Sequence, residues 1–455
     1  MERYSAADRA AWLDRLQEET FDLIVIGGGI TGAGIALDAV TRGLRVALLE
    51  RRDFAYGTSS RSTKIVHGGL RYLKQLEFGL VHEVGVERAI VHQNAPHVVL
   101  PERMLLPIVE GGTLSQRLSS VGLWVYDRLA KVAPEERRQM LDRDKTIELE
   151  PLLNPAGLLG GGLYYEYRTD DARLTIEAIK TAVAHGAVCL NYLDVKGFLY
   201  KDNGYVGGVT VWDALDDRTL EVRARRIVSA AGPWVDRLRG LDQEGVQGKR
   251  LHLTKGVHIV VPKERLPLKQ SVYFDVESDN RMCFAIPRGR VTYIGTTDTT
   301  YEGDIGAPMA TLQDAEYILQ ATNHLFPEAK LTVDDIESTW AGLRPLIHQD
   351  GKSPSELSRR DEVFYSKTGL ISIAGGKLTG YRKMAERVVN LVMKSLRLKV
   401  PCTTKEQRLA GGDFESDEAI QAYIYQLKGE AMQIHVPDQA IHDLVYRYGT
   451  NANVI

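Results

Sequence analysis

The glycine-rich turn that begins at Gly27 constrains the fold of this chain more than any other feature of the sequence. The apolar run 21–26 precedes it and predicts a short buried strand of a parallel sheet. The spacing Gly27-x-Gly29-x-x-Gly32 follows, and residues 33–40 then repeat apolar side chains at helical intervals. A strand, a glycine fingerprint and a helix in this order predict a βαβ unit that binds a dinucleotide.

Each part of this unit has a physical role. Gly27 allows the tight turn, Gly29 lets a pyrophosphate approach the backbone, and Gly32 lets the helix pack closely on the strand. The amide groups and the partial positive charge at the helix N-terminus suit the phosphates. A second apolar run, 44–49, predicts a neighbouring strand that ends at Glu50. An acidic group at this place suits the ribose hydroxyls of FAD or NAD, whereas a 2′-phosphate would favour a basic group.

Length, charge and cysteine usage set the class of protein. With 455 residues the chain is too long for one ordinary core, so two or three domains are expected. A formal net charge of −3 argues against a basic nucleic-acid-binding surface. Cys189, Cys283 and Cys402 lie far apart without CxxC spacing, which argues against a disulfide scaffold or a cysteine-based zinc site. We therefore expect no metal and no nucleic-acid partner, and a reducing, cytoplasmic location.

Two segments bear on membranes. The first twenty residues are too highly charged for a signal peptide and predict a short amphipathic helix. The sequence contains no apolar run of about 18 residues, the length that predicts a membrane-spanning helix. Residues 114–138 combine an apolar helix face with basic neighbours, a pattern typical of interfacial helices and, more commonly, of core-facing helices with a solvated side.

A polar loop and two later turns extend the nucleotide site. Hydroxyl side chains gather at 57–62, and the segment 64–73, "KIVHGGLRYL", places two glycines between a histidine and an arginine–tyrosine pair. This pattern suits a chain that passes close to a large flat ring. Strand–glycine–helix junctions recur near Gly232 and Gly375. Three such junctions predict one nucleotide-binding domain assembled from separated segments, as in FAD-dependent proteins of the glutathione-reductase type.

The middle of the chain predicts a second domain. Apolar or alternating runs separated by turn residues predict an antiparallel sheet over about 251–300. The Asp202-Asn203-Gly204 turn predicts a hairpin at 196–213 that is attached to the nucleotide domain. We expect the second sheet to cover one face of the cofactor, with the substrate bound between the two domains.

Three cations are candidates for binding a small anion. Arg71 and Arg344 each follow a glycine–leucine pair, and Lys377 lies at a predicted helix N-terminus, where an anionic partner is needed. Arginine forks and lysine suit a dianionic phosphate, whereas one arginine suffices for a carboxylate. His258 lies on an apolar strand, so a buried structural histidine and a catalytic one are both open, and Lys255 is expected to face the same cavity.

The chain resembles the FAD-dependent glycerol-3-phosphate dehydrogenases. The resemblance rests on "IGGGITGAGIALDAVTRGLRVALLE", "TSSRSTKIVHGGLRYL", "DDARLTI", "AAGPWVD", "TKGVHIVVP", "IGTTDT", "GLRPL" and "GGKLTGYRKMAE", in the family's order from about 20 to 400. It implies an α/β fold with a glutathione-reductase-type FAD domain of the Rossmann kind, a substrate domain with a mixed or antiparallel sheet, and a helical C-terminal segment. We expect the FAD domain at 20–100, 165–250 and 335–398, the substrate domain at 101–164 and 251–334, and a partial C-terminal domain at 399–455.

The resemblance also assigns roles to residues. It implies that FAD is held by Gly27, Gly29, Gly32, Glu50, Thr58, Ser59, Ser60, Ser62, His67, Gly68, Gly69, Ala231, Gly232, Gly376, Lys377, Leu378 and Thr379. It implies a glycerol-phosphate pocket lined by Arg71, Tyr72, Arg344, Lys377 and Thr379. His258 or Arg344 would take the proton of the C2 hydroxyl, and histidine ranks first because its ordinary pKa suits a base.

The implied reaction is oxidation of sn-glycerol 3-phosphate to dihydroxyacetone phosphate, with electrons passed from FAD to a quinone. The oxidase branch of the family, which uses O2, and a same-fold enzyme acting on an amino or hydroxy acid are the alternatives. A non-catalytic flavin-binding scaffold is a further alternative, against which the cation cluster argues. Peripheral contact with the inner face of the membrane and a homodimer are additional expectations.

Overall fold

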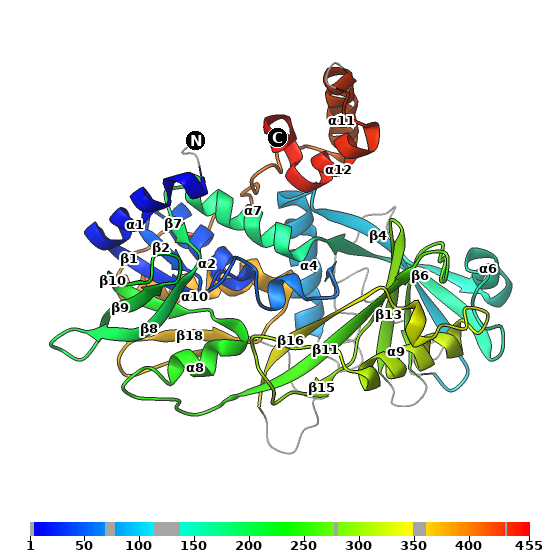
Figure 1. Cartoon of the computed structure of the whole chain (residues 1–455), viewed down its shortest axis with the longest axis horizontal. Helices are drawn as coiled ribbons and strands as arrows, with labels where there is room; N and C mark the ends of the chain where they lie inside the picture. The colour runs from blue at the N-terminus through cyan, green and yellow to red at the C-terminus, as the bar shows by residue number, and fades with distance from the viewer. Residues whose placement is uncertain (1–3, 69–77, 113–136, 277–280, 349–360, 433–434) are drawn as a thin grey trace.

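Two β-sheets lie next to each other in the protein, and helices cover the first of them (Figure 1). The computed structural model describes residues 4–68, 78–112, 137–276, 281–348, 361–432 and 435–455. The C-terminal helices stand apart from both sheets at the top of Figure 1. Among the residues so described, none of the helices combines the length and the apolar character that crossing a membrane requires.

The first sheet has a parallel centre in the order β18-β10-β1-β2-β7, with β17 antiparallel at the edge. Its strands are β1 (Thr20–Ile26), β2 (Val46–Leu49), β7 (Val188–Leu190), β8 (Leu193–Tyr200), β9 (Val206–Asp213), β10 (Arg218–Ser229), β17 (Glu362–Tyr365) and β18 (Ile371–Ala374). Ile26 of β1 lies opposite Ser229 of β10, so the carboxyl ends of the parallel strands meet at one edge.

Helix α2 (Ile30–Thr41) packs on this sheet and contacts both α7 (Asp171–Ala184) and α10 (Tyr381–Leu396). Almost every side chain of α2 is buried, because the helix is covered by the sheet on one side and by these helices on the other. Helices α1 (Arg9–Glu18) and α8 (Val235–Arg239) complete this half. The strand–turn–helix units predicted near 27, 232 and 375 are confirmed as neighbours in one sheet.

The predicted hairpin is also confirmed. Strands β8 and β9 pair antiparallel, and β9 continues the pairing onto β10, so the hairpin is attached to the nucleotide sheet. Gly204 has φ +77, a conformation that glycine adopts at no steric cost in a tight turn.

The second sheet is mixed and has the order β15-β11-β14-β13-β12-β4-β6-β3, with β16 paired to β11 and β5 paired to β6. Its strands are β3 (Ile65–Val66), β4 (Val99–Val109), β5 (Gln139–Asp142), β6 (Leu158–Thr169), β11 (Leu251–Pro262), β12 (Ser271–Asp275), β13 (Met282–Arg288), β14 (Val291–Gly295), β15 (Thr299–Thr300) and β16 (Ser338–Ile347). The helices of this half are α4 (Phe78–Asn94), α6 (Arg143–Leu149) and α9 (Leu312–Leu325).

The two sheets do not follow the domain boundaries that the sequence suggested, because the second sheet includes strands from segments placed with the FAD domain. Strand β16 pairs with β11 over its whole length and so belongs to the second sheet, although residues 335–398 were placed with the FAD domain. Strand β3 likewise pairs with β6, in the second sheet, although residues 20–100 were placed with the FAD domain. These pairings join residues that are far apart in the chain. A local sequence pattern does not indicate which strand will be the partner, so it could not predict them. The predicted antiparallel strands from β11 to β14 are confirmed, and the parallel pair of β12 with β4 makes the sheet mixed.

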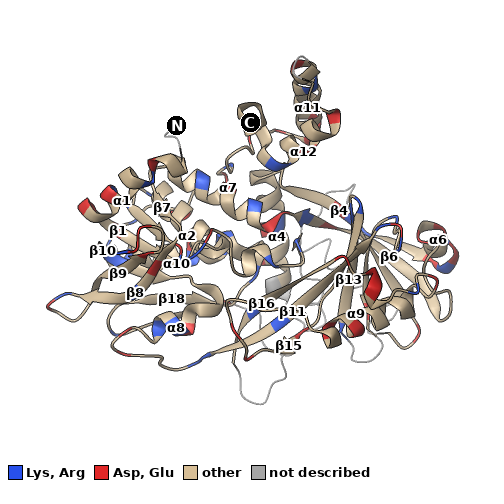
Figure 2. Ribbon diagram, in the orientation of Figure 1, with Lys and Arg blue, Asp and Glu red and all other residues tan. Residues whose placement is uncertain are grey.

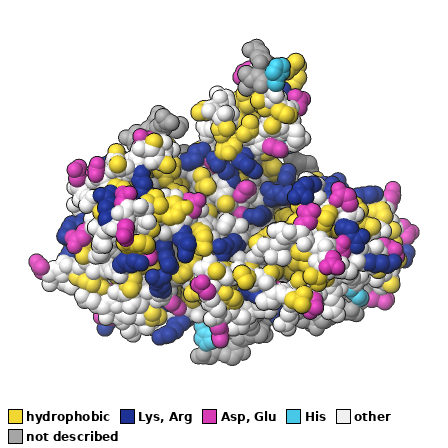
Figure 3. All heavy atoms as spheres, in the orientation of Figure 1, with side chains coloured by type: hydrophobic (Ala, Val, Ile, Leu, Met, Phe, Trp, Pro, Cys, Tyr) yellow, Lys and Arg dark blue, Asp and Glu magenta, His cyan; other side chains and the backbone are white. Residues whose placement is uncertain are grey.

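The C-terminal segment forms α11 (Asp417–Ala431) and α12 (Asp438–Tyr448), which share a small core of their own. Figure 2 shows that acidic and basic residues are spread along the strands of both sheets and along the helices. On the face seen in Figure 3, Lys and Arg side chains gather over α7, beneath the C-terminal helices.

A buried histidine lies between α4, α7 and the start of the C-terminal segment. His97 is fully buried, and neither ring nitrogen has a hydrogen-bond partner among the described residues. Burial, with Arg173 and Lys180 nearby, lowers the pKa of His97 from 6.5 to about 3.

We expect His97 to make the protein acid-sensitive. Between pH 6.5 and 3 the unfolded state binds a proton at this residue and the folded state does not, so stability falls as the pH falls through this window. At pH 5 the loss is about 2 kcal/mol. Denaturant unfolding of His97→Phe should show a shallower loss below pH 6.5, and the exposed-site variant His435→Asn should keep the original slope. Equal slopes for His97→Phe and the unsubstituted protein would contradict this assignment.

Candidate active site

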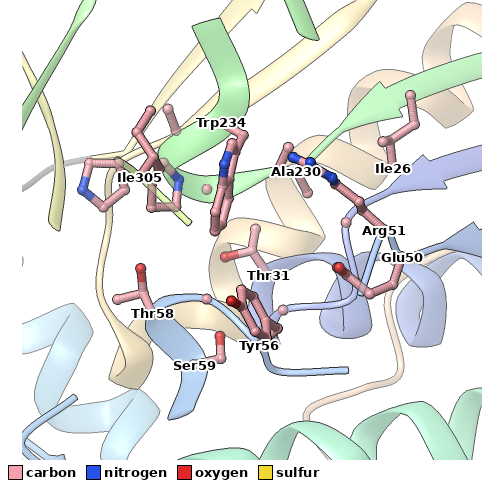
Figure 4. Close-up of a pocket in the computed structure, with 18 of the residues that line it drawn as sticks. Ile26, Thr31, Glu50, Arg51, Tyr56, Thr58, Ser59, Ala230, Trp234 and Ile305 are labelled. Atoms are coloured by element: carbon pink, nitrogen blue, oxygen red, sulfur yellow. The ribbon is translucent and has the colours of Figure 1, made fainter. Parts of the chain in front are cut away.

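A cavity of about 680 Å³ lies at the carboxyl edge of the first sheet (Figure 4). The three strand–glycine–helix junctions all contribute to it, as the sequence predicted. Of the predicted cofactor ligands, those that line it are Gly27, Gly29, Glu50, Thr58, Ser59, Ser62, Ala231, Gly232, Gly376, Lys377 and Leu378.

The glycine turn leaves no room for side chains. A Cβ on Gly32 would lie 1.9 Å from the carbonyl oxygen of Gly27, so only glycine lets α2 pack against the turn. Gly27 itself has φ +114, and a Cβ there would lie 2.6 Å from the carbonyl oxygen of Ala230. The α2 N-terminus is further held by Ser59, whose Oγ accepts a hydrogen bond of 2.9 Å from the Ile30 amide. The turn, the helix N-terminus and the hydroxyl loop thus form one cradle for an anion.

Glu50 is fixed at the end of β2. Its two carboxylate oxygens accept hydrogen bonds of 2.7 Å from the backbone amides of Gly28 and Arg52. Burial raises the pKa of Glu50, and these two amide hydrogen bonds oppose the rise. Figure 4 shows the carboxylate at one end of the cavity, the place that a ribose-binding acid occupies in this class of fold.

A smaller cavity, of about 230 Å³, adjoins the larger one and lies on the side of the second sheet. Six residues line both cavities and form their common boundary: Thr58, Ser62, Pro345, Gly376, Lys377 and Leu378. Among the described residues that line the smaller cavity, four are cations, Arg61, Arg281, Arg344 and Lys377, and one is an acid, Asp298. The excess of positive charge suits a dianionic ligand.

Arg344 reaches this cavity from β16. Its guanidinium donates to the Asp298 carboxylate at 3.2 Å and to the Thr297 carbonyl oxygen at 3.2 Å, and the side chain is 22% exposed. A Cβ on Gly256 would lie 2.4 Å from the guanidinium, so glycine on β11 makes space for it. These hydrogen bonds therefore hold the Arg344 guanidinium in one position, where it also lines the cavity.

His67 lines the same cavity and is paired with a buried acid, Glu166. Its Nδ1 is 2.7 Å from Glu166, whose other oxygen accepts hydrogen bonds from the Gly68 amide at 2.8 Å and from Arg88 at 3.3 Å. Burial alone would raise the pKa of Glu166, but His67, Arg88 and the Gly68 amide hold it below its usual value. Glu166 thus stays ionised, and Nδ1 of His67 carries the proton between them.

His258 lines the same cavity but is more deeply enclosed, with 2% of its surface exposed. Its ring stacks on Trp340 with 4.6 Å between ring centroids, and Nε2 lies 3.1 Å from the Thr63 hydroxyl. Burial, with Arg344 and Lys64 nearby, lowers the pKa of His258 to about 3. The ring is therefore neutral and a weak proton acceptor at neutral pH.

Lys255 does not reach either cavity. Alternate side chains of a strand point to opposite faces, and Lys255 and His258 are three positions apart on β11. The Lys255 ammonium is buried and pairs with Asp314 at 2.6 Å on the far face of the sheet. The structure thus separates Lys255 from the substrate side on which the sequence placed it.

Other predicted residues support the site without lining the larger cavity. Thr379 donates to the His67 carbonyl oxygen at 2.9 Å and lines the smaller cavity. The Ser60 hydroxyl turns toward its own loop, 3.3 Å from the Gly57 carbonyl oxygen. Gly69, Arg71 and Tyr72 lie outside the described residues, as does most of the amphipathic segment 114–138.

Sequence reasoning missed several residues here. Asp171 lines the larger cavity and accepts hydrogen bonds from the Ser62 amide and hydroxyl and from the Lys64 ammonium. It lies in the "DDARLTI" block, whose two adjacent acids at a helix start were the available signal. Arg61 lay within the quoted "TSSRSTK" block, whereas nothing in the local sequence pointed to Arg281 or Glu166.

Comparison with known proteins agrees with this site. The model of a family described as FAD dependent oxidoreductase matches residues 22–382. An aerobic glycerol-3-phosphate dehydrogenase of Staphylococcus aureus is 50% identical over 443 residues, which are 96% of this chain and 79% of that protein. The chain therefore belongs to the FAD-dependent glycerol-3-phosphate dehydrogenase family. The resemblance read from the sequence motifs is thus confirmed.

A solved structure supports the same family and its cofactor. The glycerol-3-phosphate dehydrogenase from Bacillus halodurans, complexed with FAD, is 48% identical, with a TM-score of 0.84 over 99% of this chain and 80% of that one. An L-alpha-glycerophosphate oxidase from Mycoplasma pneumoniae, with FAD bound, has a TM-score of 0.66 at 19% identity and shares the fold, over 85% of this chain and 97% of that one. The predicted fold class and the FAD cofactor are confirmed.

The residues of this dehydrogenase-family chain fit FAD. The glycine turn and the α2 N-terminus suit the pyrophosphate, Glu50 suits the ribose, and the long cavity ends at the boundary shared with the cation-lined cavity. The flavin end of FAD would lie at this boundary, where Lys377 and Leu378 open the helical turn η6 (Leu378–Gly380) that leads into α10.

Proposed function

We propose that the protein oxidises sn-glycerol 3-phosphate to dihydroxyacetone phosphate and uses FAD as the hydride acceptor. The observation that carries the proposal is the common boundary of the two cavities, one fitted to a dinucleotide and the other rich in cations. Relatives with about half of their residues in common carry the name glycerol-3-phosphate dehydrogenase. A small phosphate ester in the second cavity would lie against the flavin end of the first.

The chain's own residues bind and orient the substrate. Arg344 and Lys377, with Arg71 and Tyr72 as further proposed ligands, hold the phosphate by charge-assisted hydrogen bonds. Thr379 fixes the loop that carries His67, because its hydroxyl binds the His67 carbonyl oxygen. Holding the phosphate at one end sets the position of the C2 hydroxyl, and orientation of this kind contributes much of an enzyme's rate.

A histidine takes the proton of the C2 hydroxyl. The sequence ranked His258 first, but the structure favours His67, because the latter is paired with an ionised acid. Since Nδ1 of His67 donates to Glu166, its Nε2 is the nitrogen with acceptor chemistry. FAD, when bound, supplies the acceptor for the hydride that leaves C2. His258 lies in the wall of the smaller cavity, where its ring stacks on Trp340.

We propose a quinone as the physiological electron acceptor and a peripheral association with the inner face of the membrane. The S. aureus relative is named a dehydrogenase, which favours this proposal over an O2-using oxidase. Oxygen consumption and reduction of a soluble quinone should be compared under the same substrate concentration. Rapid oxygen uptake with hydrogen peroxide release would favour the oxidase alternative.

The first test of the function is an anaerobic visible spectrum of the FAD-loaded protein. Addition of sn-glycerol 3-phosphate should bleach the flavin absorption bands, and glycerol at the same concentration should not, because it lacks the phosphate that the cations recognise. An unchanged spectrum with sn-glycerol 3-phosphate would overturn the proposed substrate. Bleaching by an amino acid or a hydroxy acid instead would support the alternative enzyme class.

The variant Arg344→Met should bind substrate poorly while keeping FAD. Loss of charge-assisted hydrogen bonds to a phosphate should lower kcat/KM about a hundredfold, mostly through KM. Arg344→Lys should recover part of the loss, because a lysine keeps the charge but not the fork. Steady-state kinetics and the flavin spectrum measure both effects, with Arg265→Met, an exposed arginine paired with Asp335, as the control. An unchanged KM in Arg344→Met would remove Arg344 from the phosphate site.

A further inference from the structure

Residues 301–309 form a segment of the second half of the protein that reaches the FAD cavity. We call them the closing segment; they connect β15 to α9. Gly303, Asp304, Ile305, Gly306 and Ala307 all line the larger cavity. Glu302 and Asp304 are exposed to solvent, so the segment has the cavity on one side and water on the other. It is therefore an outer wall of the nucleotide site.

The middle of the closing segment is held by the nucleotide domain. The Tyr56 hydroxyl donates to the carbonyl oxygen of Gly306 at 2.9 Å. The Tyr56 ring is itself placed by two cations, with the Arg52 guanidinium 5.1 Å and the Arg61 guanidinium 4.9 Å from the ring centroid. In Figure 4 Ile305 and Trp234 lie along one side of the cavity and Tyr56 lies across from them.

Both ends of the closing segment are held by β11. The Tyr301 amide donates to the Leu253 carbonyl oxygen at 2.9 Å. At the other end the Lys255 ammonium donates to the Met309 carbonyl oxygen at 3.2 Å and pairs with Asp314 at 2.6 Å. Asp314 also accepts from the Thr311 amide and hydroxyl, so the first turn of α9 and the end of the segment are joined through one ion pair.

Lys255 can therefore affect the cofactor cavity without touching the cofactor. Its side chain is buried, 7% exposed, and it lines neither cavity. Its ammonium donates to Met309 at the end of the closing segment and to Asp314 in α9. Removing one partner of a buried ion pair leaves the other charge uncompensated, so the local structure rearranges. Here the residues that would rearrange are those that join the closing segment, a wall of the FAD cavity, to β11 and α9.

We propose that the closing segment retains FAD in its cavity, and that Lys255 and Tyr56 are positioning residues that hold the segment closed. Lys255 fixes the end that enters α9, and Tyr56 fixes the middle. The second half of the protein thereby contributes to cofactor retention as well as to substrate binding. Neither residue belongs to the set that the sequence assigned to FAD, and Lys255 gains a role different from the one first expected.

The test measures the rate at which FAD leaves the protein, as the rise in free flavin fluorescence after dilution of the loaded enzyme. Tyr56→Phe removes only the hydroxyl and should speed FAD loss about fivefold, the effect expected of one hydrogen bond. Lys255→Met should speed it about tenfold or more, and Lys255→Arg, which keeps the charge, should restore part of the difference.

A matched control separates retention from general stability. Tyr423→Phe removes a tyrosine hydroxyl that also donates to a backbone carbonyl oxygen, that of Thr450 at 3.1 Å, in the C-terminal helices. It should leave the rate of FAD loss unchanged. If Lys255→Met does not fold, Tyr56→Phe decides the proposal. The same rate of FAD loss in Tyr56→Phe, Tyr423→Phe and the unsubstituted protein would overturn it.

Discussion

Replacement of Gly32 by alanine is expected to weaken FAD binding about a thousandfold. The added Cβ would lie 1.9 Å from the carbonyl oxygen of Gly27, a backbone atom that cannot rotate away. Helix α2 must then move off the turn, and its N-terminal amides leave the position where they meet the pyrophosphate. Loss of two hydrogen bonds to a charged group, at about 2 kcal/mol each, weakens binding about a thousandfold.

Titration of the apoprotein with FAD, followed by quenching of flavin fluorescence, measures this effect. Gly429→Ala is the matched control, because Gly429 is also helical and a Cβ there meets no atom within 4 Å. That control should bind FAD as the unsubstituted protein does. A Gly32→Ala protein with folded-state circular dichroism and unchanged FAD affinity would show that the tight packing of α2 is not needed for the cofactor.

The second large effect is expected for His67→Gln, which should lower kcat about a thousandfold while FAD stays bound. Removal of a general base commonly costs between about a hundredfold and ten-thousandfold in rate. Steady-state kcat and KM are the measurement, and the flavin spectrum checks that FAD is still bound.

Two further variants show whether the pair of His67 with Glu166 matters as proposed. Glu166→Gln removes the charge that orients the imidazole, so it should lower kcat without changing KM in proportion. His258→Gln should lower kcat less than about tenfold. If His258→Gln, and not His67→Gln, lowered kcat about a thousandfold, His258 would be the base, as the sequence alone suggested.

The features that were predicted correctly are those whose signals are local. The glycine turn at 27–32 and the hairpin at 196–213 can each be predicted from a short stretch of sequence, because each turn conformation requires particular residues at particular spacings. The FAD cofactor and the family followed from such stretches together with the quoted motifs. For the same reason the smaller cavity was foreseen as a cation-lined site, since Arg344 and Lys377 lie in motif blocks of their own.

The features that were missed depend on strand pairing. Residues 335–398 were placed with the FAD domain, but β16 pairs with β11 of the second sheet, about ninety residues earlier in the chain. Glu166 reaches His67 only because β6 pairs with β3 across some hundred positions. A local sequence pattern indicates neither the partner strand nor the register of the pairing. The sequence therefore could not predict that Glu166 would pair with His67.

The sequence by itself determined the dinucleotide cradle, because glycine spacing acts over a few residues, and its motif blocks together indicated the family and with it FAD. Only the tertiary structure decided which histidine faces an ionised acid and which face of β11 carries Lys255. It alone brought residues 301–309 over a cavity built by the other sheet. These outcomes depend on the pairing of distant strands and on the two faces of a sheet, which are properties of the packed chain.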